Sequence, residues 1–142
     1  MLRNVPLLII PFILFNIVLT GVFDSAAGAD PWLTELFSLH MMSGGTWIMT
    51  LGDLLVLIAL MILFVEILKS TRTSNASVID HLLSTFVFVA FLVEFLLVRG
   101  AAHSVFFILM VIALFDVLAG FSISLRAANR DVTYSRDTPP TI

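Results

Sequence analysis

Four polar side chains lie within the long apolar stretches of this chain: Asn16, Asp53, Glu94 and Asp116. A charged side chain inside a bilayer is costly, so intramembrane acids usually face other helices or a water path and have a partner there. Neither lysine nor arginine lies deep in the same stretches. If the four side chains meet, their carboxylates repel one another and share protons, and the group could relay a proton or bind a cation.

A structural role for the same acids is the main alternative. Hydroxyl residues lie near them, so each acid could bond to a hydroxyl or to backbone and fix how two helices pack. Such contacts between membrane helices are worth about 1 kcal/mol. The face that carries Asp116 also has small residues that favour close packing, namely Ala113, Gly120 and Ser124. A third reading pairs an acid with a basic residue or cofactor on a partner subunit.

A fourth acid lies close to a lysine near the end of an apolar stretch. Glu66 and Lys69 are three residues apart, a spacing that brings side chains together on one helix face. We expect an ion pair there, at the membrane interface.

Histidines and methionines supply the only candidate metal ligands. His40, Met41 and Met42 offer imidazole and thioether groups that suit copper(I), and His40 with His103 could form a bis-histidine haem site. Because both histidines fall near the ends of apolar stretches or in a loop, we favour plain surface roles and predict no metal. No cofactor of the chain's own is expected; haem, pigment or quinone on a partner stays open.

Composition assigns the chain to the integral membrane proteins. Of its 142 residues, 60% are hydrophobic and only 12% are charged, and it has no cysteine. Disulfides and thiolate sites are therefore excluded. The net charge of −3 and the lack of a basic cluster give no case for nucleic-acid binding. No nucleophile with its base, phosphate-binding glycine loop or zinc motif is present, so we do not expect an enzyme.

The apolar pattern predicts an all-α, four-helix transmembrane bundle in a single domain over 1–126, followed by a short polar cytoplasmic tail over 127–142. The expected spans are about 5–23, 47–68, 78–98 and 104–125. The first is longer than the core of a usual signal peptide, so we interpret it as a retained span. Asp30 before Pro31 is typical of a helix start, which predicts a short interfacial helix over 31–37 in the first outer loop.

Basic residues predict the orientation. With four spans, only Arg99 falls on one side, and the other side carries Arg3, Lys69, Arg72, Arg126, Arg130 and Arg136. The positive-inside rule then places both termini in the cytoplasm.

Two runs, MTLGDLLVLIALMILFVEILKSTRTS (49–74) and SVFFILMVIALFDVLAGFSIS (104–124), resemble a family of small four-span inner-membrane proteins of bacteria, particularly proteobacteria, whose function is uncharacterised. The resemblance implies four helices in a bacterial inner membrane, and it implies no catalytic residue.

These features favour a small accessory or assembly subunit of a larger membrane complex, which packs through its helix faces. The expected partners are the lipid bilayer and other membrane subunits or copies of itself. The alternative is a proton or cation carrier built on Asp53, Glu94 and Asp116. A lipid or quinone binder is the third hypothesis.

Overall fold

The computed structural model describes residues 5–21, 29–70 and 76–134, which form four α-helices, two 3-10 turns and one β-hairpin. In chain order the elements are α1 Ile9–Leu19, η2 Pro31–Leu33, β1 Glu35–His40, β2 Thr46–Thr50, α2 Leu51–Ser70, α3 Ala76–Leu97, η3 Arg99–Ala101 and α4 Ser104–Tyr134.

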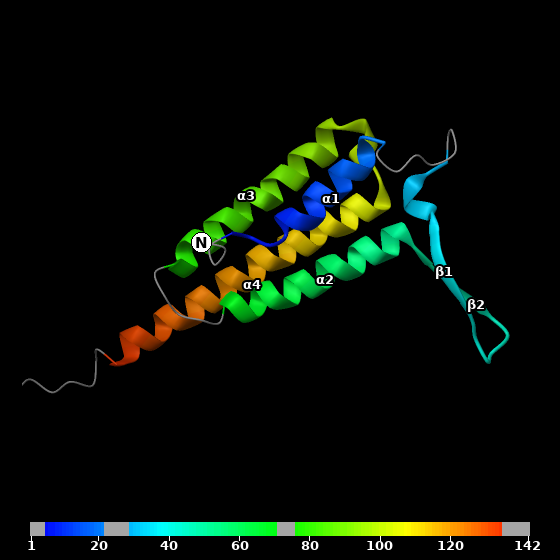
Figure 1. Ribbon diagram of the computed structural model, residues 1–142. Helices are drawn as coiled ribbons and strands as arrows, with labels where there is room; N and C mark the ends of the chain where they lie inside the picture. Colours follow the sequence, from blue (N-terminus) through cyan, green and yellow to red (C-terminus); the bar gives the residue numbers. More distant parts are fainter. Residues whose placement is uncertain (1–4, 22–28, 71–75, 135–142) are drawn as a thin grey trace, which may run out of the picture.

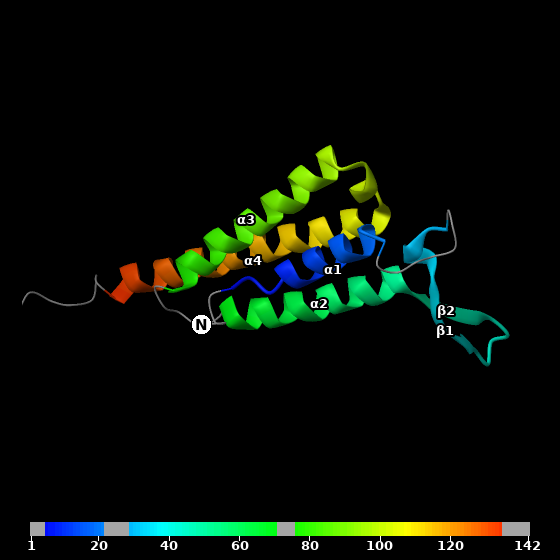
Figure 2. The ribbon, with the colours of Figure 1, turned by 45° about the horizontal axis from the view of Figure 1, so that its top comes forward.

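The four helices lie side by side in an elongated bundle, and the hairpin projects from one end of it (Figure 1). We call this the hairpin end, and we call the opposite end, where α2 finishes, the Lys69 end. Helix α4 packs extensively against both α2 and α3. Figure 2 shows that α3 diverges from α2 toward the hairpin end, with α1 and α4 between them. Helix α4 is therefore the central element of the bundle.

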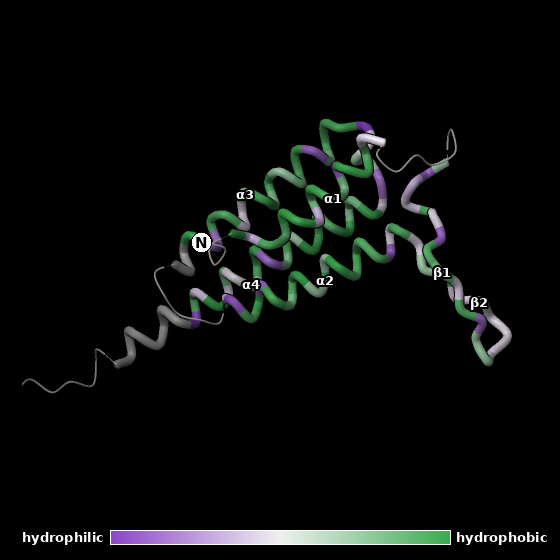
Figure 3. Tube along the Cα trace, viewed as in Figure 1, coloured by the Kyte–Doolittle hydropathy of each residue, from purple (hydrophilic) through white to green (hydrophobic). Residues whose placement is uncertain are grey.

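Three helices are long and apolar enough to cross a membrane: Leu51–Ser70, Ile79–Leu97 and Ser104–Arg126. Figure 3 shows that the helices are apolar along most of their length, with hydrophilic residues at discrete positions. A helix that is apolar nearly all round suits a lipid environment better than water. The predicted helical, membrane-embedded character of the chain is confirmed at this level.

Helix α1 is shorter than the predicted first span. It has 11 residues, about 16 Å at 1.5 Å per residue, against about 30 Å of hydrocarbon. Pro11 explains its late start, because proline has no N–H and fits the first turn, where the N–H groups lack helical acceptors. Gly21, with φ +81°, follows the last turn, and its N–H donates to the Val18 carbonyl.

The predicted interfacial helix over 31–37 is wrong beyond its first turn. Only η2 is helical; its start is capped by Asp30, whose carboxylate accepts from the Trp32 N–H at 3.0 Å. The chain then enters β1, and β2 occupies the first residues of the predicted span 47–68, so that α2 begins at Leu51. Aromatic and β-branched residues in TWIMT favour a strand, and Gly44 at φ +85° permits the turn.

Helix α4 continues beyond the predicted end of the fourth span. The span was expected to finish at 125 and a partly ordered tail to follow, but the helix runs to Tyr134. The sequence RAANR after Leu125 is rich in good helix formers, which accounts for the continuation. The rest of the predicted tail, 135–142, lies outside the described residues.

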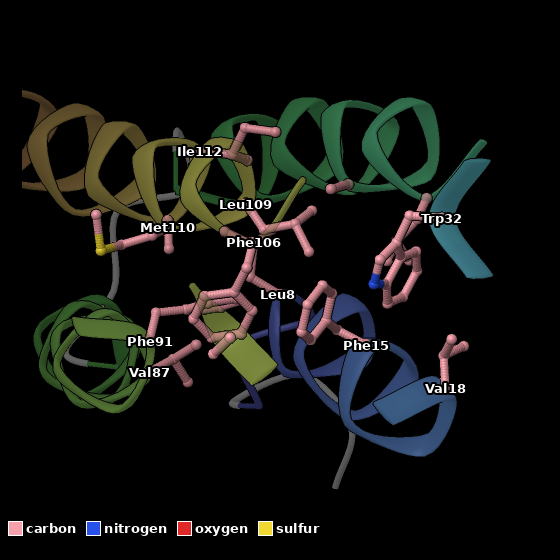
Figure 4. Packing of buried hydrophobic residues seen from close by; sticks show 14 residues of the cluster. Leu8, Phe15, Val18, Trp32, Val87, Phe91, Phe106, Leu109, Met110 and Ile112 are labelled. Atoms are coloured by element: carbon pink, nitrogen blue, oxygen red, sulfur yellow. The ribbon is translucent and has the colours of Figure 1, made fainter. Parts of the chain in front are cut away.

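An aromatic core joins the helices near the hairpin end (Figure 4). Phe106 of α4 lies 4.6 Å from Phe15 of α1 and 5.3 Å from Phe91 of α3, measured between ring centroids. The ring of Trp32 stacks on Phe15 at 4.4 Å, which ties the base of the hairpin to the bundle. All four side chains are almost completely buried. This aromatic layer lies between two sets of polar side chains, Asn16 with Glu94 on one side and the neighbours of Asp116 on the other.

Candidate functional site

The β1–β2 hairpin has two chemically different faces. Directly paired residues of an antiparallel ladder share a face. The pairs Phe37–Met49 and Leu39–Trp47 form one face, and Phe37 also contacts Trp47 edge to face, with ring centroids 5.4 Å apart. The other face has Ser38–Ile48 and His40–Thr46.

The apolar face of the hairpin is open. Phe37 is 48% exposed, Leu39 55% and Trp47 44%. Met42, at the tip of the turn, is fully exposed. We use the name hairpin patch for Phe37, Leu39, Met42 and Trp47. Large apolar side chains gathered on one exposed surface mark sites of interaction with protein or membrane.

The base of the hairpin is fixed to the bundle. The Leu51 N–H donates to the Thr34 carbonyl at 2.9 Å, where the hairpin joins α2. Across the same end, His103 Nε2 and Asp30 Oδ2 are 3.0 Å apart, and the Val105 N–H donates to His103 Nδ1. Because Nδ1 accepts, Nε2 must carry the proton that His103 donates to Asp30. The hairpin is therefore held at a defined angle to the helices.

Asn16 and Glu94 meet between α1 and α3. Asn16 Nδ2 donates to Glu94 Oε2 at 3.1 Å and also reaches the Phe12 carbonyl. The second oxygen of Glu94, Oε1, is buried and has no hydrogen-bond partner among the described residues. Two of the four polar residues singled out from the sequence are thus brought together.

Asp53 lies apart from them and caps α2. Its Oδ2 accepts from the Thr50 N–H at 3.1 Å and from the Thr50 hydroxyl at 2.7 Å, and Thr50 Oγ1 accepts from the Asp53 N–H in return. This reciprocal capping satisfies N–H groups that the first turn of a helix leaves unpaired. The carboxylate is exposed, and the capping role accounts for its contacts.

Asp116 lies on the other side of the aromatic layer from Glu94. It is 4% exposed, and its hydrogen-bonding neighbour is the side chain of Ser84 in α3, itself 7% exposed. The charged or titratable groups that act on it most strongly are Glu66, His81 and Lys69. Asp116 Oδ2 has no hydrogen-bond partner within the described part of the chain. The structure therefore groups Asp116 with side chains that were not expected beside it.

Glu66 and Lys69 belong to a larger network. Lys69 Nζ lies 3.3 Å from Glu66 Oε2, 3.4 Å from Asp80 Oδ2 and 3.1 Å from the Val5 carbonyl. Glu66 is 4% exposed and its Oε1 accepts from the Leu7 N–H. The expected ion pair is present, but its acid is buried between helices. Lys69 joins three segments that are distant in the sequence.

The small residues of α4 lie where that helix meets its neighbours. Ala113 is 1% exposed, and a Cβ placed on Gly120 would clash with His81 Nδ1. The imidazole of His81 therefore lies close against the backbone of α4 at Gly120, one turn beyond Asp116. Ser124, the third member of this face, is half-buried.

The candidate metal ligands have other partners. His40 Nδ1 lies 3.0 Å from the Thr46 hydroxyl on the polar face of the hairpin, and Met41 and Met42 are exposed in the turn. Both ring nitrogens of His103 are used within the bundle, as described above. Within residues 5–21, 29–70 and 76–134, no group of three or more His, Asp or Glu side chains could hold a metal ion.

A hydrophobic groove of about 470 Å³ runs between α1 and α3. Its lining is entirely apolar and includes Ile9, Phe12, Phe86 and Val87. Such a surface fits an acyl chain or another elongated apolar group.

Sequence reasoning missed the Asp116 surroundings. Ser84 lies four residues after Asp80 and three after His81 on α3, so both are its neighbours on the helix surface. This spacing could have shown those pairs, as it showed Glu66 with Lys69 on α2. Which face of α3 meets which face of α2 and α4 depends on long-range packing, which no local pattern encodes.

Comparison with protein-family models, with curated proteins and with solved structures finds no match for this chain.

Proposed function

We propose that this protein is an accessory subunit of a larger integral membrane complex in a bacterial inner membrane, with both termini in the cytoplasm. The hairpin patch is the observation that carries the proposal. Three helices of membrane length support the location, and the uneven distribution of basic residues along the sequence, with Lys69 and Arg126 at the Lys69 end of the described bundle, supports the orientation.

The hairpin is better suited to a protein partner than to water. A two-stranded hairpin is marginally stable alone, and its outer strand edges present unpaired N–H and C=O groups. Here the apolar face is also left exposed by the described residues of the chain. A neighbouring subunit can cover the hairpin patch, and one of its strands can pair with the free N–H and C=O groups at an edge of the hairpin.

The proton or cation carrier that was the alternative reading receives less support. It requires Asp53, Glu94 and Asp116 to form one site, and the structure places each with a different partner. Ser84, the neighbour of Asp116, lies ten residues before Glu94 on α3, about 15 Å along the axis. The buried rings of Phe91 and Phe106 lie in the intervening layer.

The test is native mass spectrometry on the protein extracted in mild detergent from its own membrane. We expect a complex of defined stoichiometry with another polypeptide. The double variant Phe37→Ser, Trp47→Ser should release the protein as a free chain, because it removes the centre of the hairpin patch. Ile48→Ser, on the opposite face of the same hairpin, is the matched control and should leave the complex intact.

A homo-oligomer or a monomer from the native membrane would contradict the proposal. Equal loss of the complex in the double variant and in Ile48→Ser would show that hairpin folding, rather than the hairpin patch, is what matters.

The groove between α1 and α3 supports a second candidate, the binding of a lipid or quinone tail. Native mass spectrometry reports this too, as a bound small molecule that survives extraction. Ala90→Phe, which fills the groove wall, should abolish such binding while leaving the polypeptide complex unchanged.

A further inference from the structure

The buried polar cluster at the Lys69 end has more acid than base. It contains Glu66 and Lys69 of α2, Asp80, His81 and Ser84 of α3, and Asp116 of α4. Among the described residues of this cluster, three carboxylates accompany one ammonium group, so two negative charges are left over when all three acids are ionised and His81 is neutral. In a low-dielectric interior such charges must be paired or protonated.

Lys69 cannot supply what Asp116 lacks. Its ammonium already contacts Glu66, Asp80 and the Val5 carbonyl, which matches its three N–H donors. Asp116 is left with the Ser84 side chain and with one buried oxygen, Oδ2, that has no hydrogen-bond partner among the described residues. Asp80 Oδ1 also lacks a hydrogen-bond partner among the described residues, but the other oxygen of Asp80 pairs with Lys69 and its side chain is 19% exposed. Asp116 is 4% exposed and contacts no cation directly, so it is the acid in this cluster that gains most from binding a proton.

The cluster is open on one side only. Lys69 and Asp80 side chains are 17% and 19% exposed, so water reaches the cluster at the Lys69 end. Between Asp116 and the hairpin end, the interior of the bundle is filled by the buried apolar side chains of Ala113, Val87, Phe91 and Phe106. Protons can therefore arrive and leave at one surface, and the packed rings block passage through the bundle.

We propose that Asp116, enclosed by Ser84, His81 and the Glu66–Lys69–Asp80 network, is a proton-binding site that opens only to the Lys69 end of the bundle. The proton comes from water at that surface, passes the partly exposed acid Asp80 and the imidazole of His81, and forms an O–H bond on Asp116 Oδ2. The reverse transfer returns it to the same side. The site adds a property to the proposed subunit and does not depend on the identity of its partner.

Infrared spectroscopy of the full-length protein in lipid nanodiscs tests the site. At neutral pH we expect the C=O stretching band of a protonated carboxylic acid, which shifts in heavy water. Asp116→Asn should remove the band. Asp53→Asn should not, because Asp53 is an exposed carboxylate that caps α2. Circular dichroism establishes that each variant is helical.

Two further variants keep the test decisive if Asp116→Asn fails to fold. Lys69→Met removes the only ammonium of the cluster and should increase the intensity of the band at neutral pH. Gly120→Ala should change the pH at which the band appears, because the added Cβ displaces the His81 ring. Absence of the band in the wild-type protein, or its persistence in Asp116→Asn, would overturn the proposal.

Sidedness needs its own measurement. In proteoliposomes of one orientation, a pH jump on the Lys69 side should change the band and a jump on the hairpin side should leave it unchanged. A response to both sides, or net proton flux through the vesicle wall, would show that the aromatic layer does not close the site and would restore the carrier reading.

Discussion

Gly52 occupies a point where three elements approach too closely for a side chain. A Cβ at this position would lie 2.8 Å from Val105 Cγ2 and 3.2 Å from the backbone oxygen of Trp32. Backbone cannot rotate away as a side chain can, so Gly52→Ala must push α2 from its neighbours. We expect a loss of about 1–3 kcal/mol in the free energy of unfolding, the usual cost of overpacking.

Thermal unfolding in detergent micelles measures this effect. Gly45→Ala is the control, because its nearest atom would be Ser43 Oγ at an ordinary 3.7 Å. An unchanged unfolding temperature for Gly52→Ala would mean that α2 and α4 are less closely packed than described.

The contact between Asn16 and Glu94 gives a second prediction at the level of single residues. Asn16→Leu removes a side-chain donor to the Glu94 carboxylate and should destabilise the protein by about 1 kcal/mol, as for other polar contacts between membrane helices. Glu94→Gln should cost less, because an amide oxygen can still accept from Asn16 and no charge is buried.

A double-variant cycle with Asn16→Leu and Glu94→Leu, each of which removes one partner of the hydrogen bond, followed by chemical unfolding, isolates the interaction. Additive effects would show that the two side chains do not interact in the membrane.

The polar residues show what a sequence can and cannot reveal about such a site. Hydropathy alone identified Asn16, Glu94 and Asp116 as buried within helices, and the i, i+3 spacing identified Glu66 with Lys69. All of these acids lie within apolar stretches and were therefore considered as one possible group, but side chains on different helices meet only if they lie at the same depth and their helices turn the same faces inward. That rotation depends on packing, here on Phe106 and on Gly120, which sets His81 against α4.

At the scale of elements, the turn of the hairpin depends on Gly44. Its φ of +85° lies in the left-handed region, which costs other residues about 1–2 kcal/mol. Since the hairpin has little stability to lose, Gly44→Ala should loosen β1 and β2 while the helices persist.

Hydrogen exchange of the amides in the β1–β2 ladder measures that loosening, with Ser43→Ala as the control in the same turn. Faster exchange confined to 35–50 is the expected result. Equal protection in Gly44→Ala and wild type would mean that the hairpin does not depend on this turn.

The long helices were predictable and the hairpin was not. The run LGDLLVLIALMILFVEILKS (51–70) has the 20 residues of a span and contains no proline, so a helix satisfies its backbone in lipid. The segment 31–50 is also apolar, and the helix-start pattern of Asp30 and Pro31 favoured a helix there. The alternation of Phe37 and Leu39 with polar neighbours, followed by Gly44, was the available strand signal.

At the scale of the whole molecule, the first segment reaches across the bundle although α1 itself is short. At one end, the Val5 carbonyl accepts from Lys69 Nζ and the Leu7 N–H donates to Glu66. At the other, the Leu19 side chain lies against Gly100. Hydrogen-bonded turns over residues 6–8 lead into α1, so the segment reaches farther than its 11 helical residues alone.

The course of the first segment leads to a prediction about topology. If residues 5–21 cross the membrane, both termini lie on the side of the basic residues and the hairpin lies on the other. The chain has no cysteine, so single introduced cysteines report their side without interference. We expect Met42→Cys, at the exposed tip of the hairpin, to react with a membrane-impermeant maleimide in intact spheroplasts.

A cysteine inserted after Met1 and another added after Ile142 should react only once the membrane is permeabilised. The N-terminal reporter is the decisive one, because α1 is the helix whose length alone does not establish a crossing. Labelling of that cysteine in intact spheroplasts would place the N-terminus with the hairpin and leave three crossings. It would also remove Val5 and Leu7 from the Lys69 end, so the network around Glu66 would have to be rebuilt without its backbone partners.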